Sequence, residues 1–394
     1  MGRGAGGWAL VVVALSCAPY LYAHYAAPPG KTFGGFLIIT QDGNSYLAKM
    51  RQGYDGAWLF RLPFTPEDQR GIFTFTFYLA LGHIARWLGA PLLPIFHLAR
   101  AVSGLFFLLT VYRSTAELTP DLAARRWAFA VAAFGSGLAV LSLLIRRNDP
   151  NAFVPVDLFV PEANGFYSIV ANPHFPLVFA LEAWAIIWVL NPPRRQLWIQ
   201  LTALIAIGLS IVSLAPYLSP VVWLAAGAGV IATRPLDRVR VARAAVLVGG
   251  MGLLLLYDVW IMRADPAVAA WASQNITPSP PPVDALLGLG IWIPFAAIGV
   301  WQLFRQRSLG FGNWDGSTAL TTGLGFSLLT WLFATAILLY VPYPLQRRFI
   351  GGVMVPLAVL SGIGVAWLFA QLSKRSWERV ASWERVASWE RVAS

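Results

Sequence analysis

Long apolar segments alternate with short polar connections along the whole chain. Runs long enough to cross a bilayer lie at 8–27, 94–112, 127–145, 173–190, 197–214, 220–231, 241–262, 285–304, 320–341 and 349–372. A helix needs about 20 mostly apolar residues to span the hydrocarbon core. The pattern therefore predicts an all-α, multi-pass membrane protein with about ten transmembrane helices.

Two apolar runs allow more than one interpretation. The first could be a cleaved signal peptide, because small residues precede Pro28. An eleventh run, 71–82 (GIFTFTFYLALG), is short for a span and is followed by His83 and Arg86. We interpret it as an interfacial or re-entrant segment, so that residues 28–93 form one long loop on the outward face.

Basic residues mark the opposite face of the predicted bundle. They gather in the connections 113–126, 192–196, 234–243 and 305–307 and in the tail that begins at Lys374. Connections rich in Lys and Arg stay on the cytoplasmic side of a membrane. Both termini are therefore predicted to be cytoplasmic, and the protein is predicted to lie in a bacterial inner (plasma) membrane.

Composition narrows the classes of function. Hydrophobic residues make up 57% of the chain and charged residues only 12%, against about 25% charged in soluble domains, which excludes an ordinary soluble enzyme. Basic cytoplasmic connections explain the net charge of +11, so we predict no nucleic-acid partner. Cys17 is the only cysteine, so neither a disulfide within the chain nor a cysteine-based metal site can form.

The chain divides into a polytopic domain, 1–375, and a short tail, 376–394. The outward face of the domain carries four long stretches, 28–91, 146–172, 263–284 and 342–348, where we expect the functional site. The tail repeats SWERVA three times, and this six-residue period is not a coiled-coil heptad. It is an accessory or disordered cytoplasmic extension, a membrane-surface helix or a duplication artefact, and we assign it no catalytic role.

The first outward stretch carries the strongest local signal, TQDGNSYLAKMRQGYDGAWLFRLPFTPED. Asp42, Tyr46 and Lys49 recur at helical spacing, which predicts a short amphipathic helix that begins near Asp42. Asp42 could serve only as the N-cap of that helix. Alternatively, an acidic residue beside an aromatic and basic loop at the membrane surface could be a general base toward a hydroxyl or amine acceptor.

Glu162 and His174 are candidate substrate-binding residues from the second outward stretch and the helix that follows it. His174 could relay a proton or bind a phosphate or a metal, whereas a lone histidine at a helix start is more often a hydrogen-bonded structural group. With nearby carboxylates it could complete an oxygen-rich site for a divalent cation. No H-x-x-x-H spacing supports such a site, so we assign no metal ligands.

Arg347 and Arg348 lie at the outer end of the last predicted span, on the face that is otherwise poor in basic residues. A planar guanidinium matches phosphate oxygens, so these two residues are candidate phosphate ligands. The alternative is snorkelling to lipid head groups. Arg146 and Arg147 form a similar pair and are a second phosphate candidate, and Arg263 is a third.

Three residues near the third outward stretch complete the candidates. Trp271 and Asn275 could stack on and hydrogen-bond a sugar, or serve only as interfacial anchors. Asp258 lies near the outer end of a predicted span, where a charge is costly. We expect it to pair with Arg263 or to face a wet cavity, and we favour pairing over catalysis.

The first 145 residues resemble the integral-membrane glycosyltransferases of the GT-C superfamily, which include the protein O-mannosyltransferases and the aminoarabinose transferase that modifies lipid A. The resemblance rests on the order of a first span, an acidic loop, a proline-containing segment and a helix that opens with arginine, with matching residues Asp42, Tyr46, Leu47, Ala48, Gly53, Pro63, Pro66 and Arg100. It implies that Asp42 is the catalytic base and that 71–89 is the second of two juxtamembrane segments. Gly43 stands where such families often carry a second acidic residue.

The resemblance implies transfer of a sugar from a polyprenyl-phosphate donor to a lipid, glycan or protein acceptor at the outer face, by an inverting displacement. The arginines would hold the donor phosphate, and membrane lipids would be the other partners. No G-x-x-x-x-G-K-[ST] motif occurs, which agrees with a donor that is not a nucleoside triphosphate. A transporter or lipid flippase is the alternative from another class, for which we detect no inverted repeat. A non-catalytic scaffold of the same fold is a third alternative.

Overall fold

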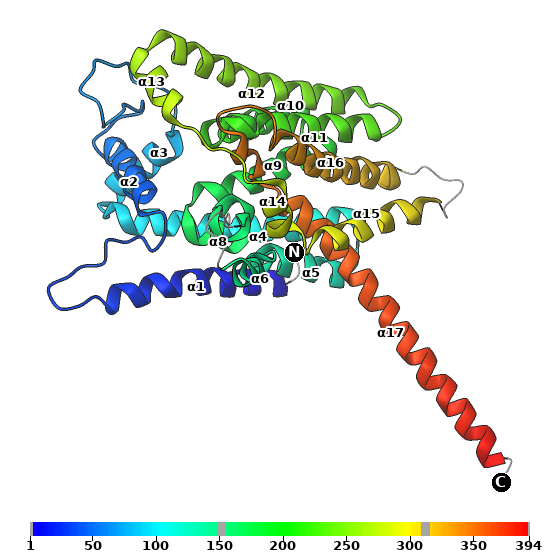
Figure 1. Ribbon diagram of the computed structural model, residues 1–394. Helices are drawn as coiled ribbons and strands as arrows, with labels where there is room; N and C mark the ends of the chain where they lie inside the picture. Colours follow the sequence, from blue (N-terminus) through cyan, green and yellow to red (C-terminus); the bar gives the residue numbers. More distant parts are fainter. Residues whose placement is uncertain (1–2, 148–154, 309–315, 393–394) are drawn as a thin grey trace.

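The computed structural model describes residues 3–147, 155–308 and 316–392, which fold into helices joined by loops and one isolated β-bridge between Phe60 and Ile72 (Figure 1). The helices are α1 (Arg3–Tyr25), α2 (Thr40–Tyr54), α3 (Thr76–Leu88), α4 (Leu92–Leu118), α5 (Leu122–Phe134), α6 (Ala139–Ile145), α7 (Val156–Phe159), η1 (Pro161–Ala163), α8 (Gly165–Ala171), α9 (His174–Leu190), α10 (Leu197–Leu214), η2 (Pro216–Leu218), α11 (Ser219–Ala232), α12 (Arg238–Ala264), α13 (Pro266–Gln274), α14 (Pro282–Leu289), α15 (Ile293–Ser308), α16 (Gly316–Leu338), η3 (Gln346–Ile350) and α17 (Met354–Val392).

Several of these helices are long and apolar enough to cross a membrane, as a multi-pass membrane protein requires. Within the described ranges there are six such helices, or eight if each of two bent helix pairs counts as one span. Two further apolar helices, α9 and the segment Pro216–Ala232, are shorter. The all-helical membrane architecture predicted from the sequence is confirmed, whereas the predicted number of about ten spans stays a prediction.

Two of the predicted spans are broken, and the two breaks dock on each other. The pair α5 and α6 bends by 47° and the pair α14 and α15 by 69°. At the breaks, the Leu138 amide donates to the Leu287 carbonyl at 2.7 Å and Trp292 Nε1 donates to the Ser136 carbonyl at 3.0 Å. The Asp157 carboxylate accepts from the Gly137 amide at 2.7 Å. Interrupted helices are tolerated at membrane depth only where such partners satisfy the freed backbone groups.

The first outward loop folds into the two short helices α2 and α3, which cross closely at one end of the bundle (left in Figure 1). A Cβ built on Gly53 would lie 2.0 Å from the Leu79 carbonyl oxygen, and one built on Gly82 would lie 1.9 Å from the Met50 carbonyl oxygen. Glycine at both positions therefore lets the two backbones touch. The segment predicted not to span the membrane becomes α3, which is not among the candidate spans of the described chain.

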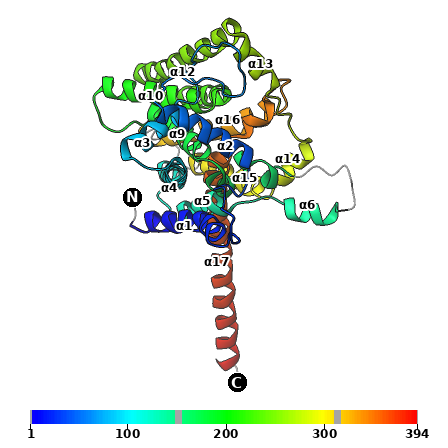
Figure 2. The same cartoon turned by 90° about the vertical axis from the view of Figure 1, so that its left-hand side faces the viewer.

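The core lies around α9, whose side chains are buried almost along its whole length. The helices α4, α10, α11, α16 and the first half of α17 surround it (Figures 1 and 2). From there α17 continues away from the bundle, and the SWERVA repeats extend it as helix to Val392. The side chains of residues 375–394 lie outside the described part of the structure.

Candidate functional site

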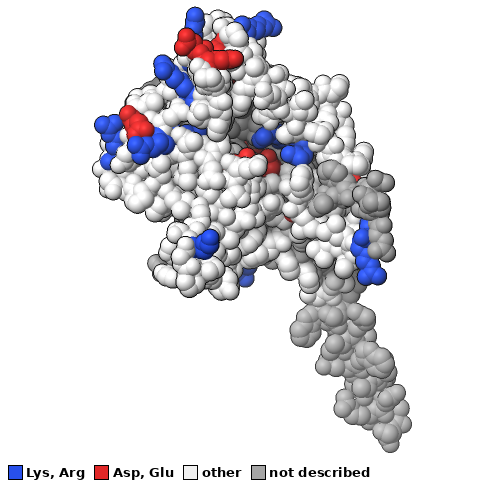
Figure 3. Space-filling model, turned by 60° about the vertical axis from the view of Figure 1, so that its left-hand side comes forward, with Lys and Arg blue, Asp and Glu red and all other residues white. Residues whose placement is uncertain are grey.

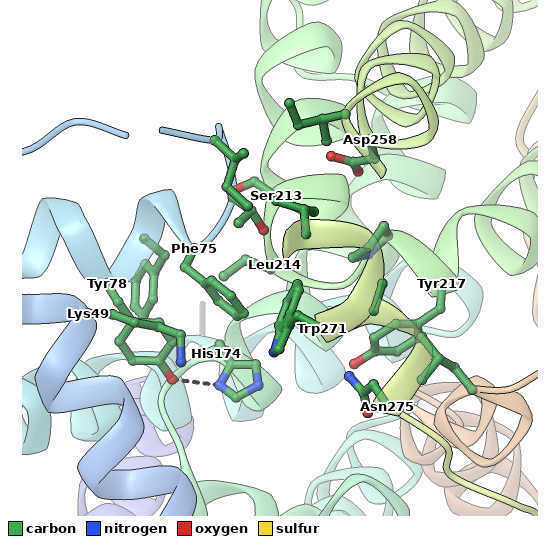
Figure 4. A pocket seen from close by; sticks show the side chains of 18 of the residues that line it. Lys49, Phe75, Tyr78, His174, Ser213, Leu214, Tyr217, Asp258, Trp271 and Asn275 are labelled. Atoms are coloured by element: carbon green, nitrogen blue, oxygen red, sulfur yellow. Dashed lines mark hydrogen bonds between the residues drawn. The ribbon is translucent and has the colours of Figure 1, made fainter. Parts of the chain in front are cut away.

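A cavity of about 280 Å³ opens where α2 and α3 meet the ends of α9, α10, α12 and α13 and the short turns η2 and η3 (Figure 4). On the surface, charged side chains of both signs gather beside a hollow near the centre of one face (Figure 3). The cavity is lined by Asp42, Ser45, Tyr46, Lys49, Ile72, Thr74, Phe75, Phe77, Tyr78, His174, Ser213, Leu214, Pro216, Tyr217, Tyr257, Asp258, Ile261, Met262, Val268, Trp271, Ala272, Asn275, Leu345 and Arg348.

One face of α2 lines one side of the cavity. Asp42, Ser45, Tyr46 and Lys49 follow each other at spacings of three or four residues and all line the cavity, as expected for one face of a helix. The predicted N-cap role of Asp42 is wrong. The helix begins at Thr40, and Ile39 precedes it in the left-handed conformation (φ 49°) without a side-chain cap. The Asp42 carboxylate is exposed and accepts no hydrogen bond from the described residues.

Lys49 points into a cage of aromatic rings. Its Nζ lies 4.3 Å from the ring centroid of Phe75, 5.0 Å from Tyr46 and 5.6 Å from Phe60, within the range of a cation–π interaction. Nζ also donates to Ser45 Oγ at 2.7 Å. Burial lowers the pKa of Lys49 to about 8, although the Asp42 carboxylate raises it. The Lys49 amine therefore gains and loses its proton close to physiological pH.

Aromatic residues from α2 and α3 join the cavity wall to α9. The Tyr78 hydroxyl and His174 Nδ1 are 2.7 Å apart (dashed in Figure 4), and the ring of Tyr46 stacks on that of Tyr78 with centroids 4.3 Å apart. Burial raises the pKa of Tyr46, and the Asp42 carboxylate raises it further while Arg348 opposes both. His174 is thus a hydrogen-bonded residue of the cavity wall. This agrees with the alternative that it is a hydrogen-bonded structural group, and Nε2 is its second polar atom.

Arg348 and Arg347 of η3, predicted as equivalent phosphate ligands, differ in position. Arg348 lines the cavity, and its Nη1 lies 3.9 Å from Glu162 Oε1. Its Nε is buried and has no hydrogen-bond partner among the described residues. Arg347 instead packs its guanidinium 5.3 Å from the ring centroid of Phe159 and does not line the cavity.

Glu162 reaches the site through this ion pair. It lies in η1, is buried, and does not line the cavity itself. Burial raises the pKa of Glu162, and Arg348 opposes the increase. The Arg348 guanidinium also lies 5.7 Å from the ring centroid of Tyr217. Glu162 and Tyr217 therefore position Arg348 toward the cavity, which makes Glu162 a supporting residue and not a direct ligand.

The third outward stretch closes the remaining side of the cavity. The Asp265 carboxylate caps α13 by accepting from the Ala267 and Val268 amides and also accepts from the Arg70 amide at 2.9 Å. This arrangement ties α13 to the loop before α3. It places Trp271 and Asn275 at the cavity, where Trp271 lies between His174 and Tyr217 in Figure 4.

The other predicted acidic and basic residues are placed differently. Asp258 lines the cavity from α12, as one of its two expected placements requires. No ion pair joins it to Arg263 within the described chain, so the expected pairing is wrong. Arg146 pairs with the buried Asp284 at 2.8 Å, away from the cavity. Sequence reasoning missed Ser45, Tyr78 and Tyr217. The spacing of Ser45 from Asp42 and Lys49 was the only signal for it, and the two tyrosines carried none.

Metal ligands and known relatives add no further constraint. In the parts of the chain that the structure describes, no group of three or more His, Cys, Asp or Glu side chains could hold a metal ion, and the divalent cation stays an open alternative. No family model matches the chain, and no curated protein matches it.

Proposed function

We propose that this protein is a membrane-embedded glycosyltransferase that takes a sugar from a polyprenyl-phosphate donor, with Asp42 as the general base and Arg348 as the phosphate ligand. The observation that carries the proposal is the meeting of these two residues, from opposite ends of the chain, in one aromatic cavity. An unpaired carboxylate and a half-satisfied guanidinium are the groups that an acceptor proton and a leaving phosphate need.

Arg348 suits an anionic leaving group because its charge is oriented before any ligand binds. Glu162 and the ring of Tyr217 hold its guanidinium, while Nε keeps an unused donor. A phosphate oxygen could accept a hydrogen bond from that donor. The attraction between Arg348 and the phosphate would increase as the sugar–phosphate bond breaks, because negative charge then develops on the phosphate. Pre-organised donors of this kind stabilise a transition state without reorganisation at the moment of reaction.

Asp42 suits the acceptor side because its carboxylate stands at the cavity without a competing hydrogen bond from the described residues. In the proposed step the acceptor oxygen attacks the anomeric carbon as its proton passes to Asp42. The bond from that carbon to the phosphate oxygen breaks, and its electron pair leaves on the phosphate. Aromatic faces such as those of Trp271 and Tyr46 could bind the sugar between the two groups.

The test is donor turnover by the purified protein with a panel of polyprenyl-phosphate hexoses and pentoses. Release of polyprenyl phosphate is expected from wild type and is expected to fall at least 100-fold in Asp42→Asn. Arg348→Gln should lose a similar factor, because removal of one such donor costs about 10²–10³ in rate. Arg347→Gln is the matched control, since it removes the adjacent guanidinium that lies outside the cavity.

The outcomes separate the proposal from its alternatives. Equal losses in Arg347→Gln and Arg348→Gln would show that charge at the membrane surface matters and not the cavity. Normal turnover in folded Asp42→Asn would remove Asp42 from the mechanism. Failure of the folded wild type to consume any donor would favour transport or a scaffold role.

A further inference from the structure

Asp42, Ser45 and Lys49 form a row along one face of α2. Residues three or four apart on a helix have Cβ atoms about 5–6 Å from each other, and all three side chains reach the cavity. The Lys49 ammonium donates to Ser45 Oγ at 2.7 Å and to the Ser45 carbonyl at 3.4 Å. Ser45 contacts Lys49 but no hydrogen bond joins it to Asp42 among the described residues, so the Asp42 side chain has to turn toward Ser45 for the hydroxyl to connect the carboxylate with the amine. A hydroxyl can accept one proton while it donates another.

The surroundings of Lys49 allow its amine to be neutral in the folded protein. The rings of Tyr46, Phe60 and Phe75 enclose Nζ, and only 6% of the residue is exposed. Removal of water from an ammonium group favours its neutral form, which agrees with the lowered pKa of Lys49.

The charged and titratable groups that line the cavity together with Lys49 come from six elements. They are Asp42 and Tyr46 on its own helix, Tyr78 on α3, His174 on α9, Tyr217 on η2, Tyr257 and Asp258 on α12, and Arg348 on η3. Asp42 favours the charged amine, and Lys49 and Arg348 both act on His174 as positive charges. Two of these groups are carboxylates, and of the two Asp42 is the one whose charge acts on the pKa of Lys49.

We propose that neutral Lys49 takes up, through Ser45, the proton that Asp42 removes from the acceptor, and so restores the Asp42 carboxylate for the next turnover. This inference rests on the proposed function. Protonated Asp42 gives its proton to the Ser45 oxygen while the Ser45 hydroxyl proton moves to Lys49 Nζ. The products are a carboxylate, an intact hydroxyl and an ammonium, which then releases the proton to solvent, so atoms and charge balance.

The two possible roles of Lys49, proton acceptor and phosphate ligand, predict opposite pH dependences of turnover. If the neutral amine is needed, turnover rises with pH through about 8. If the ammonium is needed to hold the donor phosphate, turnover falls through the same range. With a midpoint near 8 the neutral fraction grows from about one-tenth at pH 7 to about nine-tenths at pH 9, an increase of nearly tenfold.

The first experiment measures the titration of Lys49 directly, without any substrate. The chain has only three lysines, Lys31, Lys49 and Lys374, so protein labelled with 13Cε-lysine gives three resolvable NMR signals, which Lys→Arg variants assign. Lys49 is expected to titrate near pH 8, and the signals of the exposed Lys31 and Lys374 serve as references within the same sample. Asp42→Asn should lower the Lys49 midpoint further, because it removes the charge that favours the ammonium.

The second experiment measures turnover between pH 6 and pH 10 in wild type, Ser45→Ala, Lys49→Arg and the control Lys31→Arg. Wild type and the control should show the rise through about pH 8. Lys49→Arg, whose side chain keeps its charge, should lose at least tenfold in rate at pH 9 together with the rise. Ser45→Ala should lower the rate but keep the Lys49 titration within one pH unit.

The results separate the relay from the proposed function. A Lys49 midpoint equal to those of Lys31 and Lys374 overturns the relay, and so does turnover that falls through pH 8. If donor is consumed at a rate that does not depend on pH in this range, the relay is wrong and the transferase stands. If no donor is consumed, both are wrong, and a depressed Lys49 midpoint that responds to Asp42→Asn remains only as a property of the cavity.

Discussion

Gly82→Ala tests whether the position of α2 against α3 controls the site. The added Cβ would lie 1.9 Å from the Met50 carbonyl oxygen and 2.7 Å from the Tyr54 amide nitrogen. Both atoms belong to the backbone of α2, so no side-chain rotation can relieve the contact. The reciprocal position, Gly53, meets the Leu79 backbone in the same way. The two helices must therefore move apart.

The size of the effect follows from ordinary contact distances. A carbon normally approaches a carbonyl oxygen no closer than about 3.3 Å, so the local separation must grow by more than 1 Å from the 1.9 Å that the rigid helices would give. Overpacking of this kind costs about 1–3 kcal/mol. Because α2 carries Asp42, Tyr46 and Lys49, a displacement of about 1 Å is also expected to lower turnover about 100-fold.

Thermal unfolding in detergent and donor turnover measure the two effects separately. Gly252→Ala is the matched control, because a Cβ on this helical glycine of α12 meets no atom within 4 Å, and there alanine should be neutral or stabilising by up to about 1 kcal/mol. A Gly82→Ala protein as stable as Gly252→Ala would refute the close crossing. Full activity in a destabilised Gly82→Ala protein would show that the site does not depend on it.

Two further predictions concern stability. Lys49→Met should raise the free energy of unfolding at pH 7 by up to about 3 kcal/mol, because the folded state lowers the pKa of Lys49 to about 8. The difference from wild type should shrink as pH rises from 8 toward 10.5, where the lysine of the unfolded chain also loses its proton. Denaturant titrations at several pH values measure this difference. Gly352→Ala should cost about 2–4 kcal/mol, since its φ is 76° and the new Cβ would lie 2.1 Å from buried Glu182 Oε2. Gly30→Ala, with the same φ and open space, should cost only the backbone part, and equal costs in the two thermal scans would contradict the contact with Glu182.

Periodicity was sufficient to predict the amphipathic helix of the first outward loop but not the way in which it begins. Asp42, Tyr46 and Lys49 share a face because helical spacing places them there, which is a local property of the sequence. The start of α2 depends on Ile39, which adopts a left-handed conformation that costs a β-branched residue about 1–2 kcal/mol. Only tertiary packing can impose such a conformation, so propensity favoured Asp42 as a cap instead.

The broken spans show a second limit of sequence patterns. The runs 127–145 and 285–304 are mostly apolar and predict two continuous spans by composition. Each break frees backbone groups that the other break satisfies, through the hydrogen bonds of Leu138 and Trp292, and Asp157 of α7 adds a third acceptor. Hydropathy is evaluated for one segment at a time and does not include hydrogen bonds to other segments. It therefore cannot predict where a span is interrupted.

The pair Arg347 and Arg348 shows how a correct local signal becomes specific only in three dimensions. Two arginines on the outward face violate the positive-inside trend, and this anomaly led to both residues from the sequence alone. The turn η3 then points their side chains in different directions, one onto Phe159 and one into the cavity. Glu162, a residue far away in the chain, holds the second. The proposed phosphate ligand has to reach the cavity with a free donor, and of the two arginines only Arg348 lines the cavity, where its Nε has no partner among the described residues.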